Sequence, residues 1–85
     1  MYLLQNLIKE RKENPREGSY TNKLLDNNEK LKEKIMEEAS EVTGFKSRQN
    51  LVWEVSDLLY FVIVLLEKEG VDLGEIENEL WRRRK

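Results

Sequence analysis

Two pairs of carboxylates with the same spacing are the residues of this chain best suited to chemistry. Glu38 and Glu41 form the first pair, and Glu54 and Asp57 form the second, each with two residues between the acids. On a helix this i, i+3 spacing turns both carboxylates of a pair to one side, with Cβ atoms about 5–6 Å apart. Two such pairs on neighbouring helices would provide oxygen ligands for a hard divalent cation.

The residue types that are missing narrow this chemistry further. The sequence contains no cysteine and no histidine, which excludes thiolate nucleophiles, histidine bases and the usual zinc or haem ligands. Converging carboxylates repel one another and are costly to desolvate unless a cation neutralises them. An all-oxygen ligand set therefore predicts Mg²⁺, with Mn²⁺ as the alternative.

The same acids also fit a plainer interpretation as solvated helix surface. Exposed ion pairs with nearby cations such as Lys34, Lys46 and Arg48 would then satisfy them at little energetic gain. Glu38 favours the metal site, because it interrupts an apolar stripe at helical spacing. The other members of that stripe are Leu31, Ile35 and Val42.

Helical periodicity runs through nearly the whole chain, and no strand pattern is evident. Pro15 and Gly18 mark the one clear loop, and Asp72 with Glu75 forms a capping-box start for the last helix. In chain order we expect a helix that contains Leu3 and ends near Lys12, a loop over Glu13–Thr21, a short helical segment at Leu24 and Leu25, a helix over Asn28–Thr43, a helix that starts at the N-cap Ser47 and ends at Gly70, and a last helix from Asp72.

The two acid-bearing helices are expected to be antiparallel neighbours. The connection Gly44–Arg48 is short, so their axes should lie about 8–10 Å apart. Past Asp57 the longer helix is apolar all round, which indicates burial on more than one side. We therefore predict a single all-α domain over residues 1–85, a small bundle of four to five helices with an antiparallel central pair, which dimerises through the long apolar helix.

Charge and hydropathy exclude other classes of protein. The net charge of −2 does not suit a strongly basic nucleic-acid binder, and the basic ending Arg82–Lys85 is better explained as a solvated helix end. The longest apolar run, Leu58–Leu66, is well short of the roughly 20 residues that span a bilayer. Gln5 and Asn6 break the N-terminal apolar stretch, so no signal peptide is indicated. We expect a soluble cytoplasmic protein with no nucleic-acid or membrane partner.

Four segments together resemble the phosphoribosyl-ATP pyrophosphohydrolases, within the all-α MazG-like superfamily of nucleotide pyrophosphohydrolases. The acid spacing alone is moderately specific, and its combination with the Gly-Ser-Tyr-Thr block is strong. The resemblance covers nearly the whole chain from Leu7 onward. The segments are Glu10–Pro15 (ERKENP), Gly18–Leu25 (GSYTNKLL), Glu37–Val42 (EEASEV) and Glu54–Tyr60 (EVSDLLY).

The resemblance implies the second step of histidine biosynthesis, the hydrolysis of phosphoribosyl-ATP to phosphoribosyl-AMP and pyrophosphate, by a dimer that uses Mg²⁺. Glu38, Glu41, Glu54 and Asp57 would hold the metal, with Glu37 as an auxiliary ligand. Glu41, with Glu38 beside it, would be the catalytic pair, and Glu41 the base. The residues expected to bind the substrate are Arg11, Lys12, Ser19, Tyr20, Thr21, Lys23 and Lys34.

Two departures from the family pattern bear on the mechanism. Met36 stands where a glycine is usual, and Phe61 stands where a histidine is common. A histidine base is thus absent, so a carboxylate or metal-bound water must take the proton. Two alternatives remain open from the sequence: a house-cleaning nucleoside triphosphate pyrophosphohydrolase of the same superfamily, and a non-catalytic helical dimerisation or interaction protein.

Overall fold

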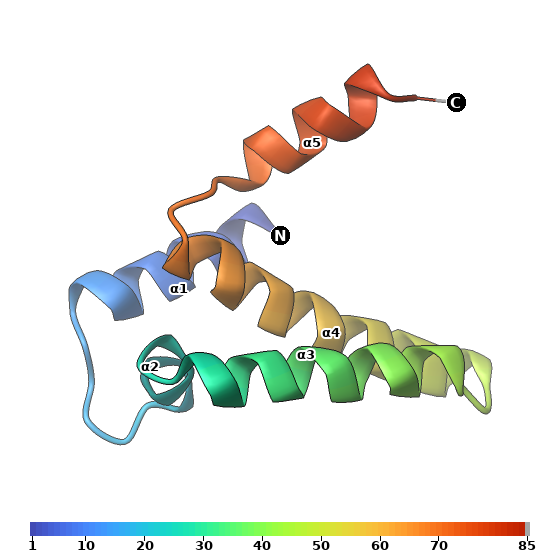
Figure 1. The fold of residues 1–85 in the computed structure, drawn as a ribbon, viewed down its shortest axis with the longest axis horizontal. Helices are drawn as coiled ribbons and strands as arrows, with labels where there is room; N and C mark the ends of the chain where they lie inside the picture. The colour runs from blue at the N-terminus through green and yellow to red at the C-terminus, as the bar shows by residue number, and fades with distance from the viewer. Residues whose placement is uncertain (85) are drawn as a thin grey trace.

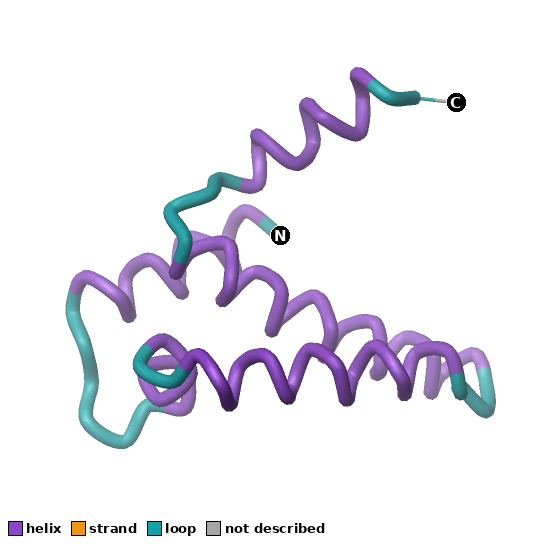
Figure 2. The backbone as a smooth tube through the Cα atoms, in the orientation of Figure 1, coloured by secondary structure: helices purple, strands orange, loops and turns teal. Residues whose placement is uncertain are grey.

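The computed structural model describes residues 1–84, and these residues fold into five helices without a strand. Figure 1 labels the helices and colours the chain from its N-terminus to its C-terminus, and the tube in Figure 2 shows the loops that join them. This confirms the predicted all-α fold. The helices are α1 (Tyr2–Glu13), α2 (Tyr20–Leu25), α3 (Asn28–Thr43), α4 (Arg48–Lys68) and α5 (Leu73–Arg82).

Polar side chains fix where four of the helices begin. At the start of α2, the Ser19 hydroxyl accepts a hydrogen bond from the Asn22 backbone N–H at 3.3 Å. The predicted loop over Glu13–Thr21 therefore ended two residues too late, because a serine N-cap starts the helix at Tyr20, and it began one residue too early, because Glu13 still belongs to α1. The other side-chain caps are Asn27 for α3, Ser47 for α4 and Asp72 for α5, the last in the predicted capping box with Glu75.

Helices α3 and α4 form the predicted antiparallel pair, and α1 and α2 pack over only one end of it (Figure 1). We call this the closed end. The opposite end, around the Gly44–Ser47 connection, has neither α1 nor α2 over it, and we call it the open end. The buried apolar residues all belong to the core of the closed end: Ile8, Leu24, Leu31, Phe61, Ile63 and Val64.

Helix α5 projects away from the other helices (Figure 2). The buried Gln5 anchors its start, because its side chain donates to the Val71 carbonyl at 3.3 Å and accepts from the Leu73 N–H at 3.2 Å. The apolar face predicted for this helix exists, but its side chains Ile76, Leu80 and Trp81 are exposed. Four helices thus form the bundle and the fifth extends from it. In the basic tail, Lys85 lies outside the described residues.

Helix α4 is long and apolar enough, by length and composition alone, to cross a membrane. It also supplies Phe61, Ile63 and Val64 to the core. The core helix of a soluble protein commonly meets the same criterion, and the predicted role of α4 as the central apolar helix of the bundle is the one seen here.

Candidate active site

Three of the four acids predicted as metal ligands come together between α3 and α4. One carboxylate oxygen each from Glu38, Glu41 and Glu54 lies within 4.8 Å of the others. The antiparallel packing of the two helices produces this group, which we call the acid group. Asp57 is exposed one turn further along α4 and lies outside it, and so does the exposed Glu37.

The acid group contains two buried oxygens that lack a hydrogen-bond partner. They are Oε2 of Glu38 and Oε2 of Glu54. A buried carboxylate oxygen without a donor is unfavourable, and few remain in folded proteins. A divalent cation bound between the helices would satisfy both, so the residues present fit the predicted metal.

Electrostatic repulsion within the acid group acts on the pKa of two of its members. Burial raises the pKa of Glu38, and the negative charges of Asp57 and Glu54 raise it further, although a hydrogen bond with Glu41 opposes the change. The hydrogen bond with Glu54, together with the charges of Glu38 and Glu54, raises the pKa of Glu41 to about 7. The metal-free group therefore holds a proton near neutral pH, as carboxylates that share a site do.

The start of α2 reaches α4 one turn beyond Asp57. The hydroxyls of Thr21 and Tyr60 are hydrogen bonded at 2.5 Å, and the Tyr20 ring stacks on that of Tyr60 with centroids 6.5 Å apart. Tyr20 also packs edge-to-face against Phe61, with ring centroids 6.3 Å apart. Tyr20 and Thr21 of the sequence motif are thus held against the acid-bearing helix.

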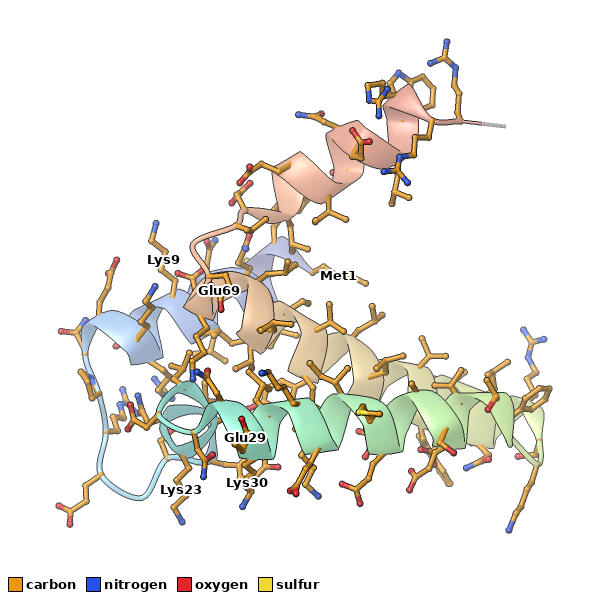
Figure 3. All side chains as sticks on the ribbon, in the orientation of Figure 1. Met1, Lys9, Lys23, Glu29, Lys30 and Glu69 are labelled. Carbon is orange, nitrogen blue, oxygen red and sulfur yellow. The ribbon has the colours of Figure 1, made fainter. Side chains whose placement is uncertain are left out.

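A lysine that the sequence did not single out lies beside this aromatic cluster. Lys30 places its ammonium 5.9 Å from the centre of the Tyr20 ring. Figure 3 shows Lys23 and Lys30 projecting on the same side of the molecule, from α2 and from the start of α3. Lys34, one turn before Glu38 on α3, pairs with Glu37 at 3.5 Å. No motif indicated Lys30, since only the packing of α2 on α3 brings it to Tyr20.

Other predicted substrate residues have local structural partners. Lys12 donates to the Glu67 carbonyl at 2.9 Å, and Glu67 lies about 20 Å along α4 from Glu54 at 1.5 Å per residue. Arg11 pairs with Glu10, and its carbonyl accepts from the Asn22 side chain at 2.8 Å. The structure therefore does not bring Lys12 to the acid group, and Ser19 serves as the cap of α2.

Asn50 is a neighbour of the acid group that the sequence analysis missed. Its side-chain Nδ2 donates to Oε1 of Glu54 at 3.1 Å. A single asparagine in the first turn of a helix attracts no notice in a sequence. The only available signal was its place four residues before Glu54, where side chains on one helix face meet.

Comparison with known proteins agrees with the resemblance in the sequence. The family model described as phosphoribosyl-ATP pyrophosphohydrolase matches residues 1–84. The histidine biosynthesis bifunctional protein HisIE of Pyrococcus furiosus is 51% identical over 83 residues, which are 96% of this chain and 40% of that protein. HisIE of Thermotoga maritima is 44% identical over 86 residues, 96% of this chain and 44% of that protein.

A shorter relative is covered more fully. The phosphoribosyl-ATP pyrophosphatase of Listeria monocytogenes is 47% identical over 79 residues, which are 89% of this chain and 77% of that protein. The chain thus spans less than half of the two HisIE proteins and about three quarters of the Listeria protein. Since the family model matches the whole described chain, this protein belongs to the phosphoribosyl-ATP pyrophosphohydrolase family.

Proposed function

We propose that this chain hydrolyses phosphoribosyl-ATP between its α and β phosphates, giving phosphoribosyl-AMP and pyrophosphate, in the second step of histidine biosynthesis. Family membership and the name of the Listeria relative support this substrate. The observation that carries the chemistry is the acid group, with its three convergent carboxylates and two unpartnered buried oxygens.

The acid group suits Mg²⁺, or Mn²⁺ in its place. Glu38, Glu41 and Glu54 would hold the ion, and Asp57 and Glu37, which lie on the same two helices outside the acid group, would act as auxiliary ligands. When bound, such an ion neutralises charge on the triphosphate and on the leaving pyrophosphate. Glu41 is the exposed member of the group, and we assign it the proton of the attacking water, with the carboxylate of Glu38 beside it.

Residues of α2 and the start of α3 are our candidates for holding the substrate. Tyr20 and Thr21 lie against α4 at Tyr60, one turn beyond Asp57, and the half-exposed Tyr20 ring can stack on a base. Lys34 lies one turn from Glu38 and can reach a phosphate. Lys23 and Arg11 remain weaker candidates, because neither contacts the residues around the acid group among the interactions described for residues 1–84.

We also propose that two copies associate through the open end. Met36, Phe45, Val52 and Trp53 are exposed there, more apolar surface than a small monomer usually leaves in water. A symmetric dimer would bury this surface without an additional partner. As a soluble metabolic enzyme the protein would work in the cytoplasm, with no membrane or nucleic-acid partner.

The test is pyrophosphate release from phosphoribosyl-ATP and, in parallel, from ATP, GTP, CTP and UTP, with Mg²⁺ or with EDTA. Mg²⁺-dependent release confined to phosphoribosyl-ATP is the expected result. Release from the ordinary triphosphates instead would favour a house-cleaning pyrophosphohydrolase. No release from any substrate by folded protein would favour a non-catalytic dimerisation protein and overturn the proposal.

A further inference from the structure

Asn50 connects the acid group to the loop that joins α3 and α4. Its Oδ1 accepts a hydrogen bond from the Lys46 backbone N–H at 2.9 Å, while its Nδ2 donates to Oε1 of Glu54 at 3.1 Å. One side-chain amide thus contacts the backbone of the Gly44–Ser47 connection and a carboxylate of the acid group. Asn50 is itself only partly exposed.

The orientation of this amide is determined by its two partners. The Lys46 N–H requires an acceptor and the Glu54 carboxylate requires a donor, so exchanging the amide oxygen and nitrogen would break both bonds. The backbone of Asn50 belongs to the first turn of α4, where its N–H donates to the Ser47 hydroxyl at 3.0 Å. Asn50 therefore presents a donor to Glu54 in a fixed position.

This donor determines which oxygen of Glu54 is left free. Oε1 is occupied by Asn50, and Oε2 is buried without a partner. A carboxylate held at one oxygen loses rotational freedom, so less entropy remains to be lost when the other oxygen binds a ligand. Ligating carboxylates in proteins are commonly held by such outer hydrogen bonds.

We infer that Asn50 is a positioning residue that orients Glu54 for the cation of the acid group and couples that group to the Gly44–Ser47 connection. The inference rests on the proposed function in one respect only, that the acid group binds a divalent cation. If Asn50 served only to cap α4, then Asn50→Ala and Ser47→Ala would have the same effect on cation binding.

Ser47→Ala provides the matched control, because it removes the side-chain cap of α4 and leaves the contact between Asn50 and Glu54 in place. Asn50→Ala removes that contact and keeps the Ser47 cap. Both variants weaken the same end of the same helix, so both are expected to lower the melting temperature slightly. Only Asn50→Ala should change the properties of the cation site.

The experiment measures Mn²⁺ binding by electron paramagnetic resonance titration of the wild type and both variants, after circular dichroism has verified helix content. We expect Asn50→Ala to weaken Mn²⁺ binding about 10-fold and Ser47→Ala to leave it within 2-fold of the wild type. In the activity assay, Asn50→Ala should raise the Mg²⁺ concentration for half-maximal pyrophosphate release by a similar factor. The rate at saturating Mg²⁺ should change less than 2-fold.

A measurement on the unaltered protein avoids any dependence on how the variants fold. The side-chain amide resonances of Asn50 should shift as Mg²⁺ is added, along the same binding curve that Mn²⁺ competition gives. Resonances that stay unchanged while the acid group fills would overturn the inference.

Three further results would overturn it, and the hydrolysis assay tests the proposed function separately. Equal Mn²⁺ affinity in wild type and Asn50→Ala, or equal weakening by Ser47→Ala, would reduce Asn50 to a capping role, while wild-type hydrolysis of phosphoribosyl-ATP would still stand. Absence of Mn²⁺ binding to the wild type would mean that the acid group holds no cation for which Asn50 could orient Glu54. Conversely, weakened binding in Asn50→Ala without hydrolysis by the wild type would uphold the inference and reject the proposed function.

Discussion

The two ends of the α3–α4 pair differ in how far their apolar side chains are buried. At the closed end Leu31 and Ile63 are each 1% exposed, whereas at the open end Met36 is 75% and Trp53 is 60% exposed. The same helices carry the acid group, on the C-terminal half of α3 and the N-terminal half of α4. Apolar packing at one end stabilises the pair, and the other end can tolerate converging charges because it does not have to form the core.

The largest expected difference between the two ends is in the loss of unfolding free energy when an apolar side chain is truncated. Leu24 is fully buried at the closed end, so Leu24→Ala should lower the free energy of unfolding by about 2–5 kcal/mol. Val52→Ala at the open end is the control, with an expected loss below about 1 kcal/mol because the side chain is half exposed. Urea denaturation measures both, and equal losses would contradict the division between the ends.

Removing a charge from the acid group should affect activity rather than folding. Glu54→Gln keeps the size of the side chain and removes its charge, so we expect pyrophosphate release to fall at least about 100-fold, or about 2.7 kcal/mol of transition-state stabilisation. The exposed Glu33 on α3 provides the control Glu33→Gln, which should keep wild-type activity. If Glu54→Gln released pyrophosphate at the wild-type rate in the steady-state assay, the acid group would not take part in the reaction.

The metal-free protein should be more stable without one of these charges. Glu38→Gln removes a carboxylate whose pKa is raised by burial and by the charges of Asp57 and Glu54. We expect its melting temperature in EDTA to exceed that of the wild type by a few degrees. Mg²⁺ should raise the melting temperature of the wild type and not that of the variant. A variant that melts below the wild type in EDTA would show that the Glu38 carboxylate stabilises the metal-free fold more than its repulsion destabilises it.

The same repulsion makes the stability of the metal-free protein depend on pH. The pKa of Glu41 is raised from 4.5 to about 7 by its hydrogen bond with Glu54 and by the charges of Glu38 and Glu54. Because the folded state holds a proton that the unfolded chain releases, stability is greatest below about pH 4.5 for this group and is lost as the pH rises to about 7.

Thermal denaturation in EDTA at fixed protein concentration should therefore give a higher melting temperature at pH 5.5 than at pH 8. The Glu41→Gln variant should lose most of this dependence, since glutamine does not titrate. A wild-type melting temperature that rises from pH 5.5 to pH 8 would contradict the raised pKa.

The sequence predicted the elements of this fold well because their signals are local. Helical spacing, the cap Ser47 and the capping box at Asp72 each act within a few residues, and all are found in the structure. The end of the loop was missed by two residues, because Ser19 can be read either as a loop residue or as a cap. The exposure of Ile76, Leu80 and Trp81 was not predictable, since periodicity indicates an apolar face and not what covers it.

The candidate site was predicted less completely, because its geometry depends on packing between helices. The i, i+3 spacing put Glu38 and Glu41 on one side, but only the register of α3 against α4 selects Glu54 rather than Asp57 as the third member. Asn50 and Lys30 acquire their roles from contacts at 3.1 Å with Glu54 and at 5.9 Å from the Tyr20 ring. Neither contact has a sequence motif of its own.

The central claim, that the open end holds a divalent cation in the acid group, is tested most directly by Mn²⁺ titration of three proteins: the wild type, Glu38→Gln and Glu33→Gln. The account predicts that wild type and Glu33→Gln bind Mn²⁺ with the same affinity and that Glu38→Gln binds at least about 10-fold more weakly. Equal binding by all three proteins would contradict the claim.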